Sequence, residues 1–177
     1  MKHFASTLLA AALLASPAAA ALKVGDKAPD FTAQAALGGK EFQFALADAL
    51  KKGPVVVYFY PKAFTTGCSL EAHAFAEAMP QFTALGASVI GVSHDDIATL
   101  DKFSTADCAS AFPVAADTDQ AIMKSYDAVL TKKPEFANRT SYLVAPDGTI
   151  LAEYTNLDYS AHVDTMLSAL KAWKASH

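Results

Sequence analysis

The chain has 177 residues, of which 53% are hydrophobic and 18% charged, and its formal net charge is -4. Disordered chains are poorer in apolar residues and richer in charge, so this composition excludes one. Eight glycines and eight prolines exclude a collagen-like rod, and the lack of a basic cluster argues against a nucleic-acid partner. Two cysteines are too few for a disulfide-stapled miniature fold or a structural zinc site.

The first twenty residues have the pattern of a secretory signal peptide. Lys2 lies near the start, an apolar run follows at 4–14, and small residues at 16–21 provide an Ala-x-Ala cleavage site. The apolar run is too short and too rich in alanine for a membrane span. We therefore expect residues 1–20 to be removed and residues 21–177 to form one soluble domain without a membrane partner, periplasmic or secreted. An uncleaved amino-terminal anchor is the alternative.

The rest of the chain alternates between strand and helix patterns. A continuous β-branched and aromatic run at 55–60 predicts a strand that is buried on both faces. Apolar residues then recur every three or four positions, which predicts a helix from Cys68 to Phe82. A second buried strand is predicted at 87–93, and a helix follows it. The candidates for the amino-terminal cap of that helix are Asp95 and Asp96.

The second half of the chain predicts a short strand, a small helix, a hairpin and a closing helix. The strand falls near 112–116, and the small helix starts at 117–119. Residues 146–148 are a Pro-Asp-Gly turn signal between two antiparallel strands. Apolar residues at helical spacing extend from Val163 to Trp173. This order predicts an α/β domain whose central mixed sheet is covered by helices on both faces.

Cys68 is the first candidate for chemistry, because it opens a helix shortly after a buried strand. Unpaired backbone N–H groups and the helix dipole favour an anion there, which for cysteine is the reactive thiolate. Lowering the thiol pKa to about 6 raises the thiolate fraction roughly thirtyfold at pH 7, or ~2 kcal/mol. That gain is too small for a fast enzyme, so oriented donors near the reacting oxygen must supply the rest. By position alone, a small buried hydrophobic residue is the better interpretation of Cys68.

The residues around Cys68 carry a family resemblance. Residues 61–68 contain P-x-x-x-T-x-x-C, which resembles the active-site loop of the peroxiredoxins. The preceding Tyr-Phe-Tyr-Pro-Lys at 58–62, together with Gly67 and Glu71, is most similar to the peroxiredoxin Q (bacterioferritin comigratory protein) subfamily. Further matching segments extend the resemblance over nearly all of the chain after the first twenty residues: 24–31, 91–93, 139–144 and 147–148.

This resemblance implies a thioredoxin-like fold and the reduction of hydrogen peroxide and organic hydroperoxides by a cysteine thiolate, with no metal, haem or flavin cofactor. Cys68 is then the peroxidatic nucleophile, which attacks one peroxide oxygen and becomes a sulfenic acid. Thr65 presents its hydroxyl to the thiolate and the peroxide, and Pro61 shields the pocket from water. The backbone N–H groups of Gly67 and Cys68 can donate to the peroxide oxygens.

Arg139 is the single arginine of the chain, and the other basic residues are lysines. A guanidinium is always charged and offers a rigid fork of donors. Placed beside the thiolate, it would lower the thiol pKa and bind the peroxide. Glu71, one turn after Cys68, can orient the fork through a bidentate contact. An ordinary surface arginine at a strand edge is the alternative.

Cys108 is the second thiol of the chain. Some peroxiredoxin Q members carry the resolving cysteine five residues after the first, and His73 holds that position here. Other members carry it on the helix after the next strand, so the resemblance implies an intramolecular Cys68–Cys108 disulfide. That bond requires Cα atoms within about 7 Å. A helix start and a neighbouring helix rarely stand that close in a packed pocket, so we expect both segments to unwind locally during turnover. An inert Cys108 in a one-cysteine enzyme is the alternative.

The reductant implied by the resemblance is a thioredoxin-like dithiol, and the protein is expected to be a monomer. A thiol–disulfide oxidoreductase for protein clients is one alternative, although the chain has no C-x-x-C. A copper carrier that uses Cys68, His73 and a methionine is another. The wide separation of the two cysteines in the sequence disfavours it.

Two positions near Cys68 depart from the family pattern. Thr66 stands where the family usually has proline, and Phe64 stands where a polar residue is common. We expect the Phe64 ring to make the mouth of the pocket more apolar, which would favour organic hydroperoxides over hydrogen peroxide.

Overall fold

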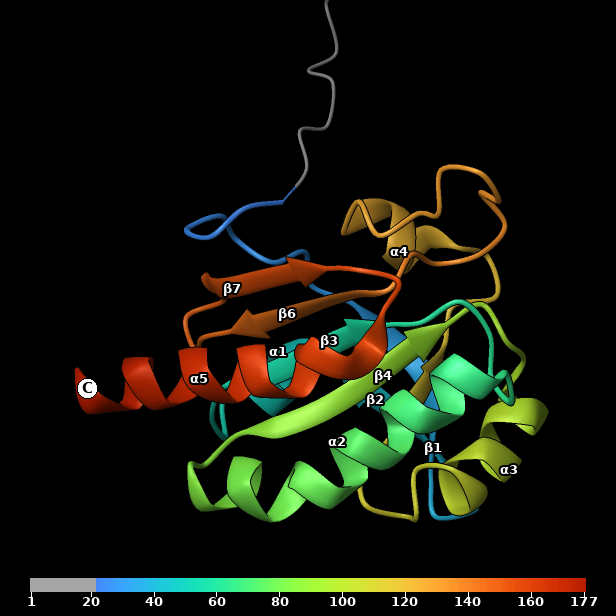
Figure 1. Ribbon diagram of the computed structural model, residues 1–177, viewed down its shortest axis with the longest axis horizontal. Helices are drawn as coiled ribbons and strands as arrows, with labels where there is room; N and C mark the ends of the chain where they lie inside the picture. The colour runs from blue at the N-terminus through green and yellow to red at the C-terminus, as the bar shows by residue number, and fades with distance from the viewer. Residues whose placement is uncertain (1–21) are drawn as a thin grey trace, which may run out of the picture.

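A single sheet with helices on both faces organises the chain (Figure 1). The computed structural model describes residues 22–177, and the expected signal peptide at 1–20 lies outside the described residues. In chain order the elements are β1 (Thr32–Leu37), β2 (Lys40–Ala45), α1 (Leu46–Leu50), β3 (Val55–Phe59), α2 (Thr66–Ala84), β4 (Ser88–Ser93), α3 (Ile97–Ala106), β5 (Val114–Ala116), α4 (Ala121–Ser125), β6 (Thr140–Val144), β7 (Ile150–Thr155), the 3-10 turn η1 (Tyr159–Ala161) and α5 (His162–Ala175).

The sheet has seven strands in the order β2-β1-β5-β4-β3-β6-β7. β3, β4 and β5 run parallel to one another, whereas the outer pairs are antiparallel. Parallel neighbours require crossover connections, and α2 and α3 supply them. The mixed sheet and the β6–β7 hairpin confirm the predicted α/β class.

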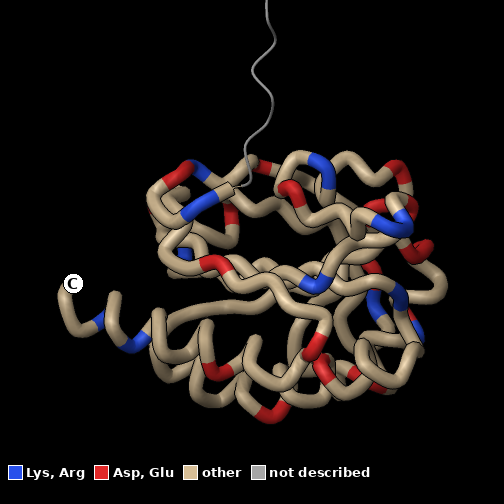
Figure 2. The backbone as a smooth tube through the Cα atoms, turned by 45° about the horizontal axis from the view of Figure 1, so that its top comes forward, with Lys and Arg blue, Asp and Glu red and all other residues tan. Residues whose placement is uncertain are grey.

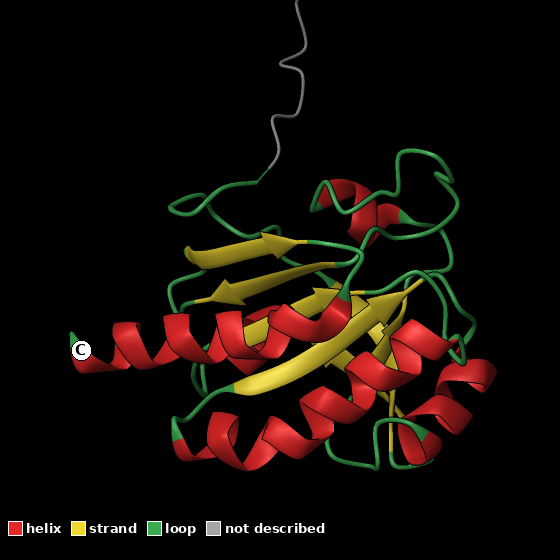
Figure 3. Cartoon of the chain, viewed as in Figure 1, coloured by secondary structure: helices red, strands yellow, loops and turns green. Residues whose placement is uncertain are grey.

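Each face of the sheet carries its own hydrophobic core, which explains why β3 lacks a polar side. Val56 and Tyr58 pack with α2 and α5, whereas Val57 and Phe59 pack with α1 and α4 on the other face. Every residue of β3 is buried. Figure 3 shows α2 and α5 running across the near face of the sheet, with α3 beside α2.

Gly91 of β4 leaves space for the Tyr58 side chain between the sheet and α2. A Cβ at Gly91 would lie 2.8 Å from the ring of Tyr58 on the neighbouring strand. The same ring stacks on Phe75 of α2, with centroids 4.4 Å apart. Gly91 therefore leaves space for a ring on which α2 packs.

The structure adds an amino-terminal hairpin and a short helix that the sequence did not predict. β1 and β2 pair over their full length, and β1 then joins β5. The apolar positions of β1 are mostly alanines, so this segment lacks the β-branched and aromatic residues by which a strand is recognised. The short α1 follows β2 directly.

The sequence left Asp95 and Asp96 open as caps of the helix after β4, and the structure gives them different roles. Asp96 caps α3, because its carboxylate accepts from Thr99 N at 2.7 Å. Asp95 is instead buried beneath the loop after β3. Asp117 accepts from the backbone N–H groups of Ile122 and Met123 and so supports the start of α4, as predicted for the 117–119 segment.

Basic and acidic residues are interspersed along the described chain rather than segregated (Figure 2). Within residues 22–177, no helix is both long and apolar enough to cross a bilayer.

Candidate active site

The first turn of α2 surrounds Cys68 with unpaired backbone donors. Thr65 is the N-cap in an extended conformation, and the first helical hydrogen bond runs from Ser69 N to Thr65 O at 2.8 Å. The N–H groups of residues 66–68 therefore have no partner in the helix. The turn contains no acidic side chain, and Cys68 is only 2% exposed. The position suits an anion that is shielded from water.

Arg139 reaches this turn from the residue before β6. Its Nη2 lies 3.5 Å from Cys68 Sγ, its Nε donates to Leu157 O at 2.9 Å, and its Nη1 donates to Glu71 Oε2. Arg139 is buried, and three separate partners fix the plane of the guanidinium. The structure thus brings Cys68, Glu71 and Arg139 together. The contact to Glu71 uses one carboxylate oxygen, so the predicted bidentate geometry is wrong.

Gly67 makes this approach of Arg139 possible. A Cβ at Gly67 would lie 3.2 Å from Arg139 Nη2, tighter than an ordinary van der Waals contact. Because the guanidinium is tied to Glu71 and Leu157, it cannot easily yield. Gly67 therefore contributes room for the cation as well as a backbone N–H.

A buried histidine stands behind Glu71. His162 Nδ1 lies 3.7 Å from Glu71 Oε1 and 2.8 Å from Ser141 Oγ, and its Nε2 lies 2.9 Å from Asn156 O. Because a carbonyl only accepts, Nε2 carries the hydrogen and Nδ1 accepts from the Ser141 hydroxyl in the neutral ring. Burial lowers the pKa of His162, and the charge of Arg139 acts in the same direction. The sequence assigned this histidine no role.

One cation in this site serves two acidic groups. Burial raises the pKa of Glu71 to about 8, although the neighbouring Arg139 guanidinium acts to lower it. A proton held by Glu71 near neutral pH leaves more of the guanidinium charge for a thiolate at Cys68. Glu71 and Cys68 therefore share one cation, Arg139.

The Thr65 hydroxyl is oriented by its own loop. Thr65 Oγ1 donates to Lys62 O at 2.9 Å. Among residues 22–177, no hydrogen bond joins Thr65 to Cys68. With its hydrogen committed to Lys62, Thr65 Oγ1 can act toward an incoming molecule as an acceptor. A peroxide O–H is a suitable donor for it.

A mainly apolar pocket of about 310 Å³ lies beside this loop. Its lining residues come from the loop itself and from the segment after α4: Pro61, Lys62, Thr65, Leu130, Lys133 and Phe136. Phe64 does not line it, because its half-exposed ring packs edge-on against Phe103 with centroids 5.2 Å apart. Leu130 and Phe136, which are distant in sequence, supply the apolar lining of this pocket. The expected effect of Phe64 on peroxide preference stays a prediction.

Asp95 fixes the loop that carries Pro61 and Thr65. Its Oδ2 accepts from Ala63 N at 2.7 Å and from Ser93 Oγ at 2.8 Å, and the carboxylate is buried. The end of β4 is thereby tied to the loop after β3. Asp95 acts on the site through the backbone of Ala63.

Cys108 lies in the turn after α3, two residues past the end of the helix, and not on the helix as predicted. It is a free thiol and fully buried. Burial raises its pKa strongly, and the charge of Asp107 adds to the rise. Both cysteines belong to the same hydrophobic core. Cys108 therefore rests as a neutral thiol.

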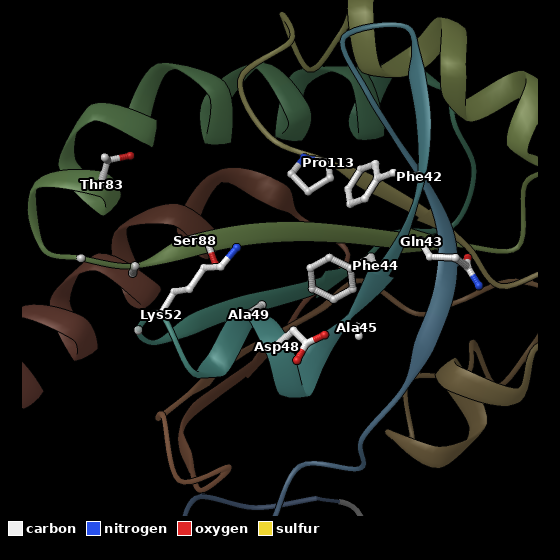
Figure 4. Close-up of a pocket in the computed structure, with 13 residues that line it drawn as sticks. Phe42, Gln43, Phe44, Ala45, Asp48, Ala49, Lys52, Thr83, Ser88 and Pro113 are labelled. Carbon is white, nitrogen blue, oxygen red and sulfur yellow. The ribbon is translucent and has the colours of Figure 1, made fainter.

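A larger pocket of about 620 Å³ lies at the opposite end of α2 (Figure 4). Phe42, Phe44, Pro113 and Thr83 are among its lining residues. At 1.5 Å of rise per residue, Thr83 lies about 22 Å along the helix from Cys68. This pocket is separate from the thiol site. Within residues 22–177, no group of three or more His, Cys, Asp or Glu side chains could hold a metal ion.

A family profile and two sequence relatives among known proteins match this chain. The profile described as "AhpC/TSA family" matches residues 24–153. The peroxiredoxin Bcp of Xanthomonas campestris pv. campestris is 34% identical over 127 residues, which cover 67% of this chain and 76% of the relative. A chloroplastic 2-cysteine peroxiredoxin of Chattonella marina var. antiqua is 34% identical over 158 residues, or 85% and 80% of the two chains.

Solved structures share the fold. The peroxidoxin BcpB of Mycobacterium tuberculosis superposes with a TM-score of 0.77 at 28% identity, covering 85% of this chain and 97% of that chain. Peroxiredoxin Q of Xanthomonas campestris superposes with a TM-score of 0.69 at 32% identity, covering 80% and 90%. The regions that superpose on these two structures include nearly all of the sheet and its helices.

Proposed function

Because this chain belongs to the AhpC/TSA family and is a thiol-dependent peroxidase, we propose that Cys68 is its peroxidatic cysteine and Cys108 its resolving cysteine. Its relatives place it in the Bcp, or peroxiredoxin Q, subfamily with a thioredoxin-like fold. The observation that carries the assignment of Cys68 is the 3.5 Å approach of Arg139 Nη2 to its Sγ. Among residues 22–177, no cationic side chain donates a hydrogen bond to Cys108 Sγ.

In the first step the Cys68 thiolate attacks the nearer oxygen of the hydroperoxide. The S–O bond forms as the O–O bond breaks, the sulfur is oxidised to a sulfenic acid, and the departing oxygen takes a proton to become water or an alcohol. Charge develops on the two oxygens during this step. Arg139 and the N–H groups of Gly67 and Cys68 are placed to stabilise that charge. Thr65 Oγ1 accepts from the peroxide O–H, and Pro61 limits the access of water.

In the second step the Cys108 thiol condenses with the Cys68 sulfenic acid. The S–S bond forms, the S–O bond breaks, and water leaves. A thioredoxin-like dithiol then reduces the disulfide. Cys108 is fully buried beyond the end of α3, and we expect its segment to open locally when the disulfide forms.

Two single variants test these roles. We expect Cys68→Ser to abolish the rapid consumption of peroxide. We expect Cys108→Ser to form one sulfenic acid, trapped by a dimedone-type reagent, and to lose turnover with a thioredoxin-type reductant. Full turnover by Cys108→Ser would make the protein a one-cysteine enzyme. Rapid peroxide consumption by Cys68→Ser would refute the central assignment.

We also propose that the protein is exported and acts as a monomer. The support for export is the signal-peptide pattern of residues 1–20. Expression of the full chain in a bacterium, followed by fractionation and intact mass, tests it. The expected product is a periplasmic or secreted chain that begins near residue 21. A cytoplasmic product that retains residues 1–20 would contradict export, and a stable dimer in light scattering would contradict the monomer.

A further inference from the structure

A single carboxylate ties the segments of the two cysteines together. Ser69 Oγ donates to Asp107 Oδ2 at 3.1 Å, and His73 Nε2 lies 3.4 Å from Asp107 Oδ1. Ser69 directly follows Cys68 on α2, and Asp107 directly precedes Cys108 at the end of α3. The Asp107 side chain is only 16% exposed. We refer to Ser69, His73 and Asp107 as the clasp.

The backbone after Cys108 is strained in its closed position. Ala109 and Ser110 are consecutive left-handed residues with φ of 49° and 57°, a conformation that costs energy for residues with a Cβ. Short-range hydrogen bonds hold them there, from Ser110 N to Ser104 O at 2.9 Å and from Ala111 N to Cys108 O at 2.8 Å. An opened turn would be free of this strain, so we expect the rate of opening to depend on the contacts that hold the turn.

We propose that Asp107 is a positioning residue for the disulfide step. Through Ser69 and His73 it keeps Cys108 in its buried place and sets the rate at which Cys108 reaches the oxidised Cys68. This inference rests on the proposed function. It goes further by naming side chains that control the second step without touching the peroxide.

The clasp also sets the fate of the sulfenic acid. At Cys68 this group either condenses with the Cys108 thiol, which releases water, or reacts with a second peroxide to give a sulfinic acid and water or an alcohol. A firmer clasp slows the first route and leaves more time for the second. The ratio of disulfide to sulfinic acid at a fixed peroxide concentration therefore reports the strength of the clasp.

The test compares three variants with a matched control. Ser69→Ala/His73→Ala breaks the clasp and keeps the Asp107 carboxylate, Asp107→Asn removes that charge, and Asp107→Glu retains it. Glu77→Gln changes an exposed charge on the same helix. Reduced protein is mixed with peroxide, quenched with an alkylating agent at a series of times, and analysed by intact mass.

We expect the first oxidation of Cys68 to be unchanged in every variant. Disulfide formation should accelerate on the order of fivefold in Asp107→Asn and in Ser69→Ala/His73→Ala, the factor that one hydrogen bond commonly contributes to an equilibrium. The sulfinic acid fraction should fall correspondingly. Asp107→Glu should lie near the wild type, and Glu77→Gln should match it.

Each other outcome is decisive. Acceleration in Asp107→Asn alone would mean that the charge next to Cys108 matters and the clasp does not, which overturns the proposal. Unchanged or slower disulfide formation in both clasp variants, with a normal wild-type disulfide, also overturns it and leaves the proposed function intact. If the wild type forms no Cys68–Cys108 disulfide, the resolving role itself fails.

Discussion

The two cysteines are equally buried but have opposite electrostatic surroundings. Cys68 stands at an open helix start with Arg139 Nη2 at 3.5 Å. Cys108 stands past a helix end, follows Asp107, and has a pKa that burial and that carboxylate raise. Burial alone would keep both thiols neutral and inert. We infer from this difference that a placed cation and free N–H donors, rather than exposure, make Cys68 the thiol that reacts first.

Removal of the Arg139 charge should have the largest effect on the difference in reactivity between the two cysteines. Arg139→Met leaves Cys68 with burial alone, as at Cys108, and we expect the rate constant with hydrogen peroxide to fall on the order of 10²-fold to 10³-fold. Arg139→Lys keeps the charge but cannot reproduce three donor directions, so an intermediate loss is expected. Stopped-flow kinetics checks both. A wild-type rate in Arg139→Met would show that the guanidinium is not needed.

A change in the distance between Arg139 and Cys68 tests how strongly the reactivity of Cys68 depends on the position of the cation. Gly67→Ala places a Cβ 3.2 Å from Arg139 Nη2 and should push the guanidinium away from Sγ. We expect about a tenfold loss in the first step, since charged hydrogen bonds weaken steeply as their geometry degrades. The exposed neighbour Thr66→Ala is the control. Equal rates in the two variants would mean that Arg139 has room to yield.

The pH dependence of stability tests the charge balance at Arg139. Because burial raises the pKa of Glu71 to about 8, the folded state retains a proton that the unfolded state releases near pH 4.5. The stabilisation linked to that proton is complete below pH 4.5 and is lost as pH rises through 8.

Relative to Glu71→Gln, the wild-type free energy of unfolding should therefore fall by more than ~1 kcal/mol across this window, since one pKa unit corresponds to ~1.4 kcal/mol. Denaturant unfolding at several pH values measures the difference. A constant difference between the two proteins would show that Glu71 does not titrate in this range.

The smallest expected effect concerns the apolar pocket beside Thr65. Leu130→Ala removes apolar area from the pocket beside Thr65 and should lower kcat/KM for a bulky alkyl hydroperoxide about threefold relative to hydrogen peroxide. Phe64→Ala should change this ratio less, because Phe64 packs on Phe103. A larger change from Phe64→Ala than from Leu130→Ala would restore Phe64 to the pocket mouth.

Much of the fold could be predicted from local pattern. The run at 55–60 and the strand at 87–93 carry strong β-branched signals, and α2 shows its apolar spacing directly. The β1–β2 hairpin could not be predicted, because its buried positions are largely alanines. Cys108 was placed on a helix that in fact ends at Ala106, an error of a few residues at an element boundary.

The candidate site was predictable where its residues share one helix or one motif. Cys68 and Glu71 lie one turn apart, and Arg139 attracts notice as the single arginine. His162, Leu130 and the Asp107 contacts were not predictable, because tertiary packing brings them to α2 from distant segments. No local pattern distinguishes such residues from ordinary surface or core positions.

One measurement tests the central claim most directly, that surroundings rather than exposure make Cys68 the thiol that reacts first. Fully reduced protein is mixed with one equivalent of hydrogen peroxide and quenched with an alkylating agent, and its intact mass is measured. We predict that Cys68 oxidises first and that both alkylatable thiols then disappear together as one internal disulfide. In Cys68→Ser, Cys108 should stay alkylatable. Oxidation of Cys108 before Cys68, or reaction of neither thiol faster than free cysteine, would contradict the account.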